Sequence, residues 1–346
     1  MHRSLLLPAC VIAMLPLVGP RQQPTFRSRV DAVSSHARSA AEAASRFVDQ
    51  AQPTDRVGLV AAKTVEELLE RAGRYVVEYG EQMSLVIGVE HYAQWMQNAD
   101  FIRPVAKQLV SEFALVRTKD DWDGFRDVYE VDGKPVLDRQ NRLLKLFMES
   151  PAVAIEQGRK IAAESSRYNM GSIQRNFNVP TTALFFMQPA NQERFKFKRT
   201  GEDTIDGVPV WKVRYEETRK PTIIRTSQGK DMPVRGTMWI DPIQGRILKT
   251  HMEITAAAML TAGTPGASGG RGVPLVDRHV NSSASITVTY TQESKLGLLV
   301  PAEMLETYEG PTRSAFTGDE SITKINCRAT YSDFKRFETG ARVVRK

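Results

Sequence analysis

Histidine side chains are the first place to look for chemistry, because histidine binds metals and moves protons near neutral pH. Beyond its first twenty residues the chain has His36, His91, His251 and His279. None of them belongs to a metal-ligand motif. His91 directly follows Glu90, and successive residues of a strand point to opposite faces, so these two cannot bind one ion. We therefore expect no metal site and no cofactor.

Carboxylates are numerous, but their spacing defines no catalytic pair. Asp127, Glu130 and Asp132 crowd one predicted hairpin beside Arg126, and Arg126 and Glu130 can pair on one strand face. The motifs of zinc hydrolases, redox cysteine pairs and phosphate-binding loops are absent. A glycosidase-type pair needs only two carboxylates that converge in space, so a hydrolase around Asp127 or Asp241 stays open. We expect no enzyme.

Aromatic and methionine side chains suggest a binding surface instead. Soft methionine side chains beside aromatic rings line pockets for lipid-like ligands. The same residues at the same spacing also form ordinary cores, so both readings stay open. The candidates for an apolar pocket are Phe185, Phe186, Met187, Trp239, Met252, Tyr290 and Met304.

The composition limits the class of protein. The chain has 346 residues, of which 41% are hydrophobic and 25% charged, which is ordinary for a folded domain. Two cysteines are too few for a disulfide scaffold or a Cys-rich zinc site. The formal net charge of +7 is spread along the chain, and we expect it to belong to a solvated surface. Attraction to an anionic membrane is the alternative. A nucleic-acid partner is not expected, because the first twenty residues indicate export.

The first twenty residues have the pattern of a secretory signal peptide. His2 and Arg3 precede an apolar run over 5–18, which is too short to span a bilayer as a helix. We expect a periplasmic or secreted protein that is not integral to the membrane after signal removal. An uncleaved anchor is the alternative. Without Cys10 the remaining cysteine, Cys327, cannot form an internal disulfide, and its alternating context predicts a buried position.

Behind the signal, the sequence predicts a tether and one folded domain. Residues 21–60 are rich in Ala, Ser and Arg and form at most a loose helix. A helix is expected over 64–79, because Thr64 and Glu67 form a capping box before an apolar stripe. The domain spans 61–346 and carries a helical insertion at 137–193.

Alternation with period two predicts an antiparallel sheet. An Asp-Gly turn at 132–133 indicates a hairpin. A simple Gly/Ala/Pro-rich loop over 262–272 interrupts the strands that follow the insertion. The expected strands are 85–96, 109–118, 125–131, 195–200, 208–217, 221–226, 235–241, 246–255, 279–292, 297–310 and 321–337.

Two short motifs resemble a known superfamily. The segment I-D-G-V-P-V at 205–210 is followed by W-I-D-P-I-Q-G-R-I-L at 239–248, in which residues 242–245 make a turn between two strands. Over residues 205–249 this looks like the periplasmic LolA/RseB superfamily of lipoprotein carriers and lipid sensors, and the order of elements over 64–346 is similar. The resemblance implies an α+β fold: a strongly curved antiparallel sheet, or incomplete β-barrel, with helices packed on its concave face.

Three functions follow, in order of preference. The first is a non-enzymatic periplasmic binding protein that shelters an apolar ligand, either a lipid acyl chain or a lipidated protein, with the helices of 137–193 as a plug or lid. The second is a structural or regulatory envelope protein with a self-filled core that acts through a protein partner. The third is the hydrolase with dispersed carboxylates.

Overall fold

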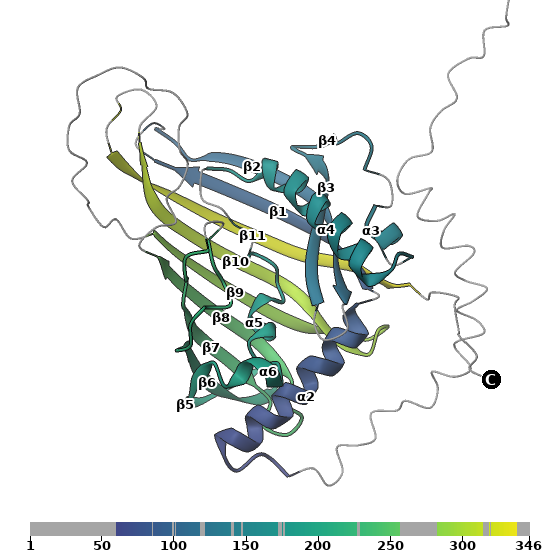
Figure 1. Ribbon diagram of the computed structural model, residues 1–346, viewed down its shortest axis with the longest axis vertical. Coiled ribbons are helices and arrows are strands. Elements are labelled where there is room, and N and C mark those ends of the chain that lie inside the picture. Colours follow the sequence, from purple (N-terminus) through teal and green to yellow (C-terminus); the bar gives the residue numbers. More distant parts are fainter. Residues whose placement is uncertain are drawn as a thin grey trace, which may run out of the picture. The chain divides into compact units, whose positions relative to one another are not determined.

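The computed structural model describes residues 60–337, apart from residues 85, 99, 101, 118–121, 140–141, 147, 172–174, 176, 227–228, 257–281, 314–317 and 319 (Figure 1). Its strands are β1 (Val86–Gln97), β2 (Val105–Arg117), β3 (Trp122–Val131), β4 (Lys134–Pro135), β5 (Phe195–Ile205), β6 (Val208–Glu217), β7 (Val234–Ile240), β8 (Ile247–Ala256), β9 (Ser282–Glu293), β10 (Leu298–Arg313) and β11 (Glu320–Arg336). Its helices are α2 (Val65–Met83), α3 (Arg142–Leu146), α4 (Pro151–Ser165), the 3-10 turn η1 (Ser166–Tyr168), α5 (Thr182–Phe185) and α6 (Pro189–Gln192).

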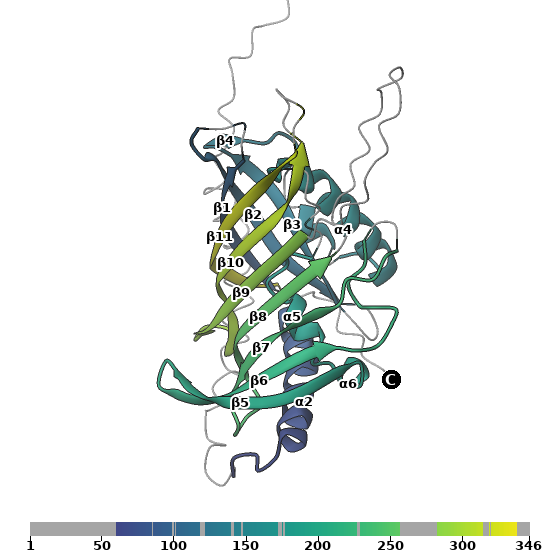
Figure 2. The ribbon, with the colours of Figure 1, turned by 90° about the vertical axis from the view of Figure 1, so that its left-hand side faces the viewer.

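All strands form one antiparallel sheet in the order β4-β3-β2-β1-β11-β10-β9-β8-β7-β6-β5. The last strand, β11, pairs with β1, so the chain returns to its beginning in the middle of the sheet. Both views show the sheet curving around α2 and α5 (Figures 1 and 2). The predicted α+β fold with a curved antiparallel sheet is confirmed.

Two hairpins use the same turn chemistry. Asp132 and Gly133 have φ angles of 48° and 76°, and Asp206 and Gly207 have φ angles of 50° and 77°. This left-handed backbone is the geometry of a tight hairpin turn, which Asp and Gly tolerate. One predicted strand is wrong: residues 221–226 form only an isolated bridge between Arg225 and Asp231, because a turn at Thr226–Lys230 ends the pairing.

Helix α2 begins at the predicted cap. The Thr64 hydroxyl accepts a hydrogen bond from the Glu67 N–H at 3.2 Å, and the Glu67 carboxylate accepts one from the Lys63 N–H at 2.8 Å. The apolar side of the helix is buried against the sheet; its buried residues include Leu68, Ala72, Val76, Tyr79 and Met83. The helix is one turn longer than the sequence predicts.

The turn at residues 242–245 contacts helix α2. The Asp241 carboxylate accepts a hydrogen bond from the Ile243 N–H at 2.8 Å and closes the turn. Arg71 of α2 donates to the carbonyls of Pro242 and Ile243, each at 3.0 Å. Gly245 has a φ of 73°, and a Cβ there would collide with the backbone of Arg71. The turn therefore fixes the start of the helix as well as a hairpin.

The helices lie on both faces of the sheet. Phe113 and Leu115 of β2 belong to the core beneath α2, whereas Ala114 and Val116 belong to a second core with α3 and α4. Because neighbouring residues of a strand point to opposite faces, α3 and α4 pack on the outer face of β1–β3. The expected placement of helices on the concave face holds for α2 and α5 and is wrong for α3 and α4.

The predicted signal peptide (1–20), the tether as far as residue 59 and the loop at 262–272 lie outside the described residues.

Candidate functional site

A cleft of 620 Å³ lies on the concave side, where the two ends of the sheet approach one another. One wall comes from the beginning of β3, the floor from the segment 177–186, which includes α5, and the other wall from the segment 223–229. The apolar lining consists of Trp122, Phe177, Val179, Phe185, Phe186, Ile223 and Ile224. The polar lining consists of Asp123, Thr181, Thr182, Arg225 and Thr226.

Two glycines let these walls come together. A Cβ at Gly80 of α2 would overlap the ring of Trp122, and a Cβ at Gly124 of β3 would overlap Val179. The absence of a side chain at both positions seats Trp122 under α2 and brings the segment with Val179 onto β3. The ring of Trp122 then meets Phe185 of α5 edge to face, with 6.4 Å between the ring centroids.

Helix α5 connects the two ends of the sheet. Phe186, at its C-terminal end, packs on Phe195 of β5 at 5.2 Å and on Tyr215 of β6 at 5.7 Å between ring centroids. Trp122 of β3 contacts the neighbouring Phe185. Residues from both ends of the sheet thus pack on Phe185 and Phe186 at the C-terminal end of α5.

The structure separates the seven predicted pocket residues. Phe186, Met187, Met252, Tyr290 and Met304 are buried in the concave core, with exposures of 0–3%. Phe185 is partly buried and, together with Phe186, lines the cleft.

Trp239 lies on the other face of the sheet. It stands between Met238 and Ile240, which are buried in the concave core, so its indole points outward. Its Nε1–H donates to the Asp203 carboxylate at 3.1 Å, and the Lys249 ammonium lies 4.8 Å from the ring centroid. The structure therefore does not bring Trp239 together with the other six residues.

The concave core also contains charged side chains that the sequence analysis missed. Glu90 of β1 is fully buried and pairs with Arg126 of β3. The Nη2 of Arg126 donates to one carboxylate oxygen of Glu90 at 2.7 Å, and its Nε donates to the other. Tyr331 of β11 donates its hydroxyl to Glu90 at 2.8 Å. The expected pairing of Arg126 with Glu130 is wrong, because Arg126 lies in this bidentate pair instead.

Arg175 is hydrogen-bonded to side chains of the same wall. It is 4% exposed. Its Nη2 donates to Gln94 Oε1 and to the carbonyl of Met170, both at 2.8 Å. Its Nη1 donates to Cys327 Sγ at 3.1 Å and to the Tyr92 hydroxyl at 3.3 Å. Burial raises the pKa of Cys327 to about 12, so this thiol stays protonated in its predicted buried position.

Glu306 of β10 is the second buried carboxylate. It accepts a hydrogen bond from the Tyr308 hydroxyl through one oxygen, while the other oxygen has no partner among the described residues. Burial raises the pKa of Glu306, although the charge of Arg126, the Tyr308 hydrogen bond and the charge of Arg175 oppose this. The four charged groups Glu90, Arg126, Arg175 and Glu306, with the tyrosines that bond them, are called the inner network below.

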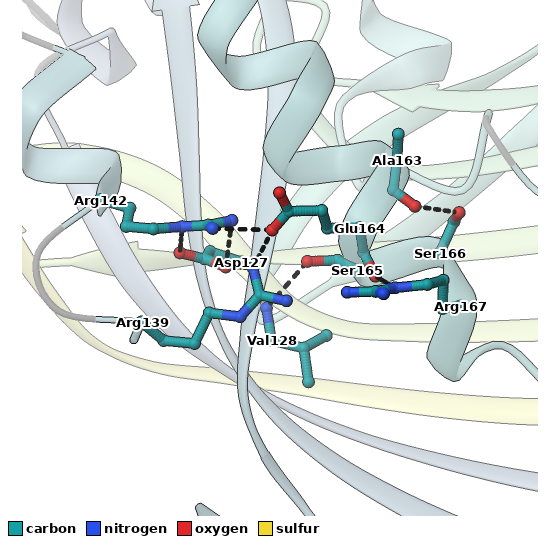
Figure 3. A network of polar contacts seen from close by, with 9 residues as sticks. All are labelled: Asp127, Val128, Arg139, Arg142, Ala163, Glu164, Ser165, Ser166 and Arg167. Atoms are coloured by element: carbon teal, nitrogen blue, oxygen red, sulfur yellow. Dashed lines mark hydrogen bonds and ion pairs between the residues drawn. The ribbon is translucent and has the colours of Figure 1, made fainter. Parts of the chain in front are cut away.

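A second network ties the helical insertion to the outer face (Figure 3). Arg142 binds both oxygens of Asp127, at 3.0 and 3.2 Å, and Arg139 binds one at 3.4 Å. Both arginines also donate to Glu164 of α4, at 2.7 and 2.5 Å. Ser165 completes the attachment, because its hydroxyl accepts a hydrogen bond from the Val128 N–H of β3 at 3.1 Å. Asp127, Arg139, Arg142 and Glu164 form the outer network.

The pKa values of the two acids of the outer network shift in opposite directions. Burial raises the pKa of Asp127, and the charges and hydrogen bonds of Arg142 and Arg139 oppose that shift. The hydrogen bond from Arg142 lowers the pKa of the exposed Glu164. All four groups are therefore occupied in holding α3 and α4, and the carboxylates do not converge on an open site.

The described part of the chain contains neither a metal-binding cluster nor a membrane-spanning helix. No group of three or more His, Cys, Asp or Glu side chains is placed to hold an ion there. No helix in that part is long and apolar enough to cross a bilayer.

Comparisons with known proteins give matches at the level of structure. No protein-family model and no curated protein matches the chain. Among solved structures, a putative outer membrane lipoprotein-sorting protein domain from Vibrio parahaemolyticus is 12% identical, with 80% of this chain and 95% of that chain covered and a TM-score of 0.31. A DUF1329 family protein from Desulfovibrio piger is 10% identical, with 80% and 94% covered and a TM-score of 0.28.

The MucA/MucB complex of Pseudomonas aeruginosa also matches. It is 10% identical, with 78% of this chain and 99% of that chain covered and a TM-score of 0.19. At such identities and TM-scores no residue role is carried over to this chain.

Proposed function

We propose that this protein is a non-enzymatic binding protein of the bacterial cell envelope that shelters an apolar ligand, such as a lipid acyl chain or the lipid of a lipidated protein. The observation that carries the proposal is the cleft between β3, α5 and the segment 223–229. Seven apolar side chains from three separate segments line this space, and the threonines, Asp123 and Arg225 complete its lining.

The size of the cleft suits such a ligand. A volume of 620 Å³ falls within the range of about 300–1,000 Å³ that is common for small-molecule sites. Each methylene group moved from water into an apolar site contributes about 0.8 kcal/mol, which is about a four-fold gain in affinity. An acyl chain therefore needs no charged partner in order to bind, and the affinity depends on its length.

The ligand is expected in the cleft and not in the interior of the curved sheet. The interior of the sheet is filled by its own side chains, among them Phe186, Met187, Met252 and Met304. A ligand therefore lies over α5, at the open side of the curved sheet, and leaves the concave wall untouched. In this proposal only the end of the insertion, from about residue 177 to 186, acts as the plug.

The test is displacement of a fluorescent fatty-acid probe by saturated fatty acids of increasing length. We expect the affinity to rise about four-fold per added methylene until the cleft is full. Ile223→Glu places a carboxylate in the wall and should weaken binding at least ten-fold. Ile322→Glu is the matched control, because Ile322 is 66% exposed on β11 and does not line the cleft. Affinity that is independent of chain length, or equal losses in both variants, would contradict the proposal.

Native mass spectrometry of the mature protein purified from its own periplasm tests the same point without a probe. A bound lipid or acylated peptide supports the proposal. A clean apo mass together with no probe displacement rejects it.

The filled interior supports a second function. Because the concave face is packed with the protein's own side chains and with the inner network, the fold can also serve as a rigid body that acts through an envelope protein partner. Failure of the displacement series, with the protein folded and free of lipid, favours this structural or regulatory role over the binding role.

A further inference from the structure

The outer face of β5–β8 carries an uneven distribution of charge. Residues that are paired across neighbouring antiparallel strands share one face, so the strand register shows which side chains are adjacent. One row across these strands reads Lys196, Glu216, Arg235 and Glu253, and its charges alternate. Arg235 Nε and Glu253 Oε2 form an ion pair at 2.8 Å in this row. The two positive and two negative charges of this first row therefore cancel.

The two adjacent rows are basic. In the second row Lys198 lies directly opposite Arg214. In the third row Lys212 is paired with Trp239, and Trp239 with Lys249. We call Lys198, Arg214, Lys212, Lys249 and Trp239 the basic face.

Like charges opposite one another in a sheet destabilise it. No ion pair is formed by Lys198 or Arg214 with any residue of the described part, and both side chains are exposed. Lys212 and Trp239 share one acid, Asp203, with 3.8 Å between the lysine Nζ and the carboxylate. The basic face therefore has four cations and one acid, a surplus that folding does not require.

A tryptophan at the centre of the cations indicates the kind of partner. Indole rings are favoured at the boundary between lipid and water, where their N–H finds a polar partner. Lysine and arginine near an anionic leaflet contribute about 1 kcal/mol each. Figure 2 views the sheet from the side opposite α2 and α5, which lie behind the strands. Among the described elements no helix covers β5–β8 on that side.

We propose that the basic face docks on the surface of a membrane that contains anionic phospholipids. This inference does not depend on the cleft, which opens on the opposite side of the sheet. The four cations lie over the headgroups, and Trp239 lies between them at the lipid–water boundary.

The test is co-sedimentation of the mature protein with vesicles of phosphatidylglycerol and phosphatidylcholine. The double variant Lys198→Gln/Arg214→Gln should weaken binding about 25-fold, since about 1 kcal/mol per cation corresponds to about five-fold. The control Lys196→Gln/Arg235→Gln makes the same change of charge in the alternating row, and its loss should stay below about three-fold. Binding of the wild-type protein should fall in 0.5 M salt, roughly as surface charges are screened.

Tryptophan fluorescence provides the second readout. Vesicles should shift the emission of the wild-type protein to the blue, and Trp239→Phe should abolish the shift. Trp95→Phe, which changes a 40% exposed tryptophan on β1, should keep it. Equal losses in the two double variants, equal binding to vesicles of pure phosphatidylcholine, or a shift that survives Trp239→Phe would overturn the proposal.

Discussion

The inner and the outer network attach the same insertion to opposite faces of the same strands. Both contain arginines and carboxylates: the acids of the inner network lie on β1 and β10, and those of the outer network lie on β3 and α4. In the inner network the side chain of Glu90 has no exposure and that of Arg126 only 13%. In the outer network Asp127 is equally buried, but its arginines also reach Glu164, whose side chain is 44% exposed.

The two networks differ in their exposure to water, and this difference determines how strictly each one fixes the insertion. Two charges in a dry core lose their hydration, and only good geometry offsets that cost. The inner network therefore fixes the position of Arg175 strictly, since a shifted guanidinium would lose its hydrogen bonds to Gln94, Met170 and Tyr92 in the dry core. The outer network tolerates displacement, because Glu164 and the solvent can replace a lost contact.

The largest effect is expected from breaking the central inner pair. Arg126→Met leaves Glu90 buried and without its cation, so the free energy of unfolding should fall by about 3–5 kcal/mol. Urea denaturation measures this change. The double variant Glu90→Leu/Arg126→Met removes both charges and should recover most of the loss. If the double variant is as unstable as the single one, the pair is not what holds this part of the fold.

A smaller effect is expected at the equivalent place in the outer network. Arg142→Leu removes two contacts to Asp127, but Arg139 keeps one contact at 3.4 Å. The free energy of unfolding should fall by about 1.5–3 kcal/mol, the usual contribution of a hydrogen bond to a charged group. If the loss equals that of Arg126→Met, the exposed Glu164 does not compensate for the contacts that Arg142 loses.

Local sequence features could predict the parts of the fold that depend on local chemistry. The Asp-Gly turns, the cap at Thr64 and the turn at Asp241–Arg246 form as expected, because each depends on a few consecutive residues. The predicted strand at 221–226 is wrong, because alternation shows which residues can share a face but does not supply a partner strand. The face on which Trp239 lies follows only from the strand register.

The inner network and the cleft depend on contacts that are distant in the sequence. Arg126 lies 36 residues from Glu90, and Tyr331 lies 241 residues from it. One signal was available: Glu90 has the same parity as Gly88 and Tyr92, so it is a charged residue on a buried strand face. A charged side chain there requires a buried partner, but nothing in the sequence identifies which arginine.

A third effect, which depends on pH, is expected at Glu112 on the outer face. Glu112 of β2 is paired across the sheet with Asp127 on the outer face. Burial, and then the charge of Asp127, raise the pKa of Glu112 to about 7, while Lys335 opposes the shift. Because the folded state holds this proton more tightly than the unfolded chain, the contribution of Glu112 to stability is complete at low pH. It is lost as the pH rises from about 4.3, the usual glutamate value, through about 7.

Glu112→Gln mimics the protonated acid and removes this dependence. The Tm of the variant should exceed that of the wild-type protein by a few degrees at pH 8, and the two should converge near pH 4. Glu164→Gln is the matched control with the opposite sign, because Arg142 lowers the pKa of Glu164 and the carboxylate stabilises the fold once it is ionised. Its Tm should therefore lie slightly below the wild-type value at pH 8. A Tm difference for Glu112→Gln that stays constant over this range would mean that Glu112 does not titrate there.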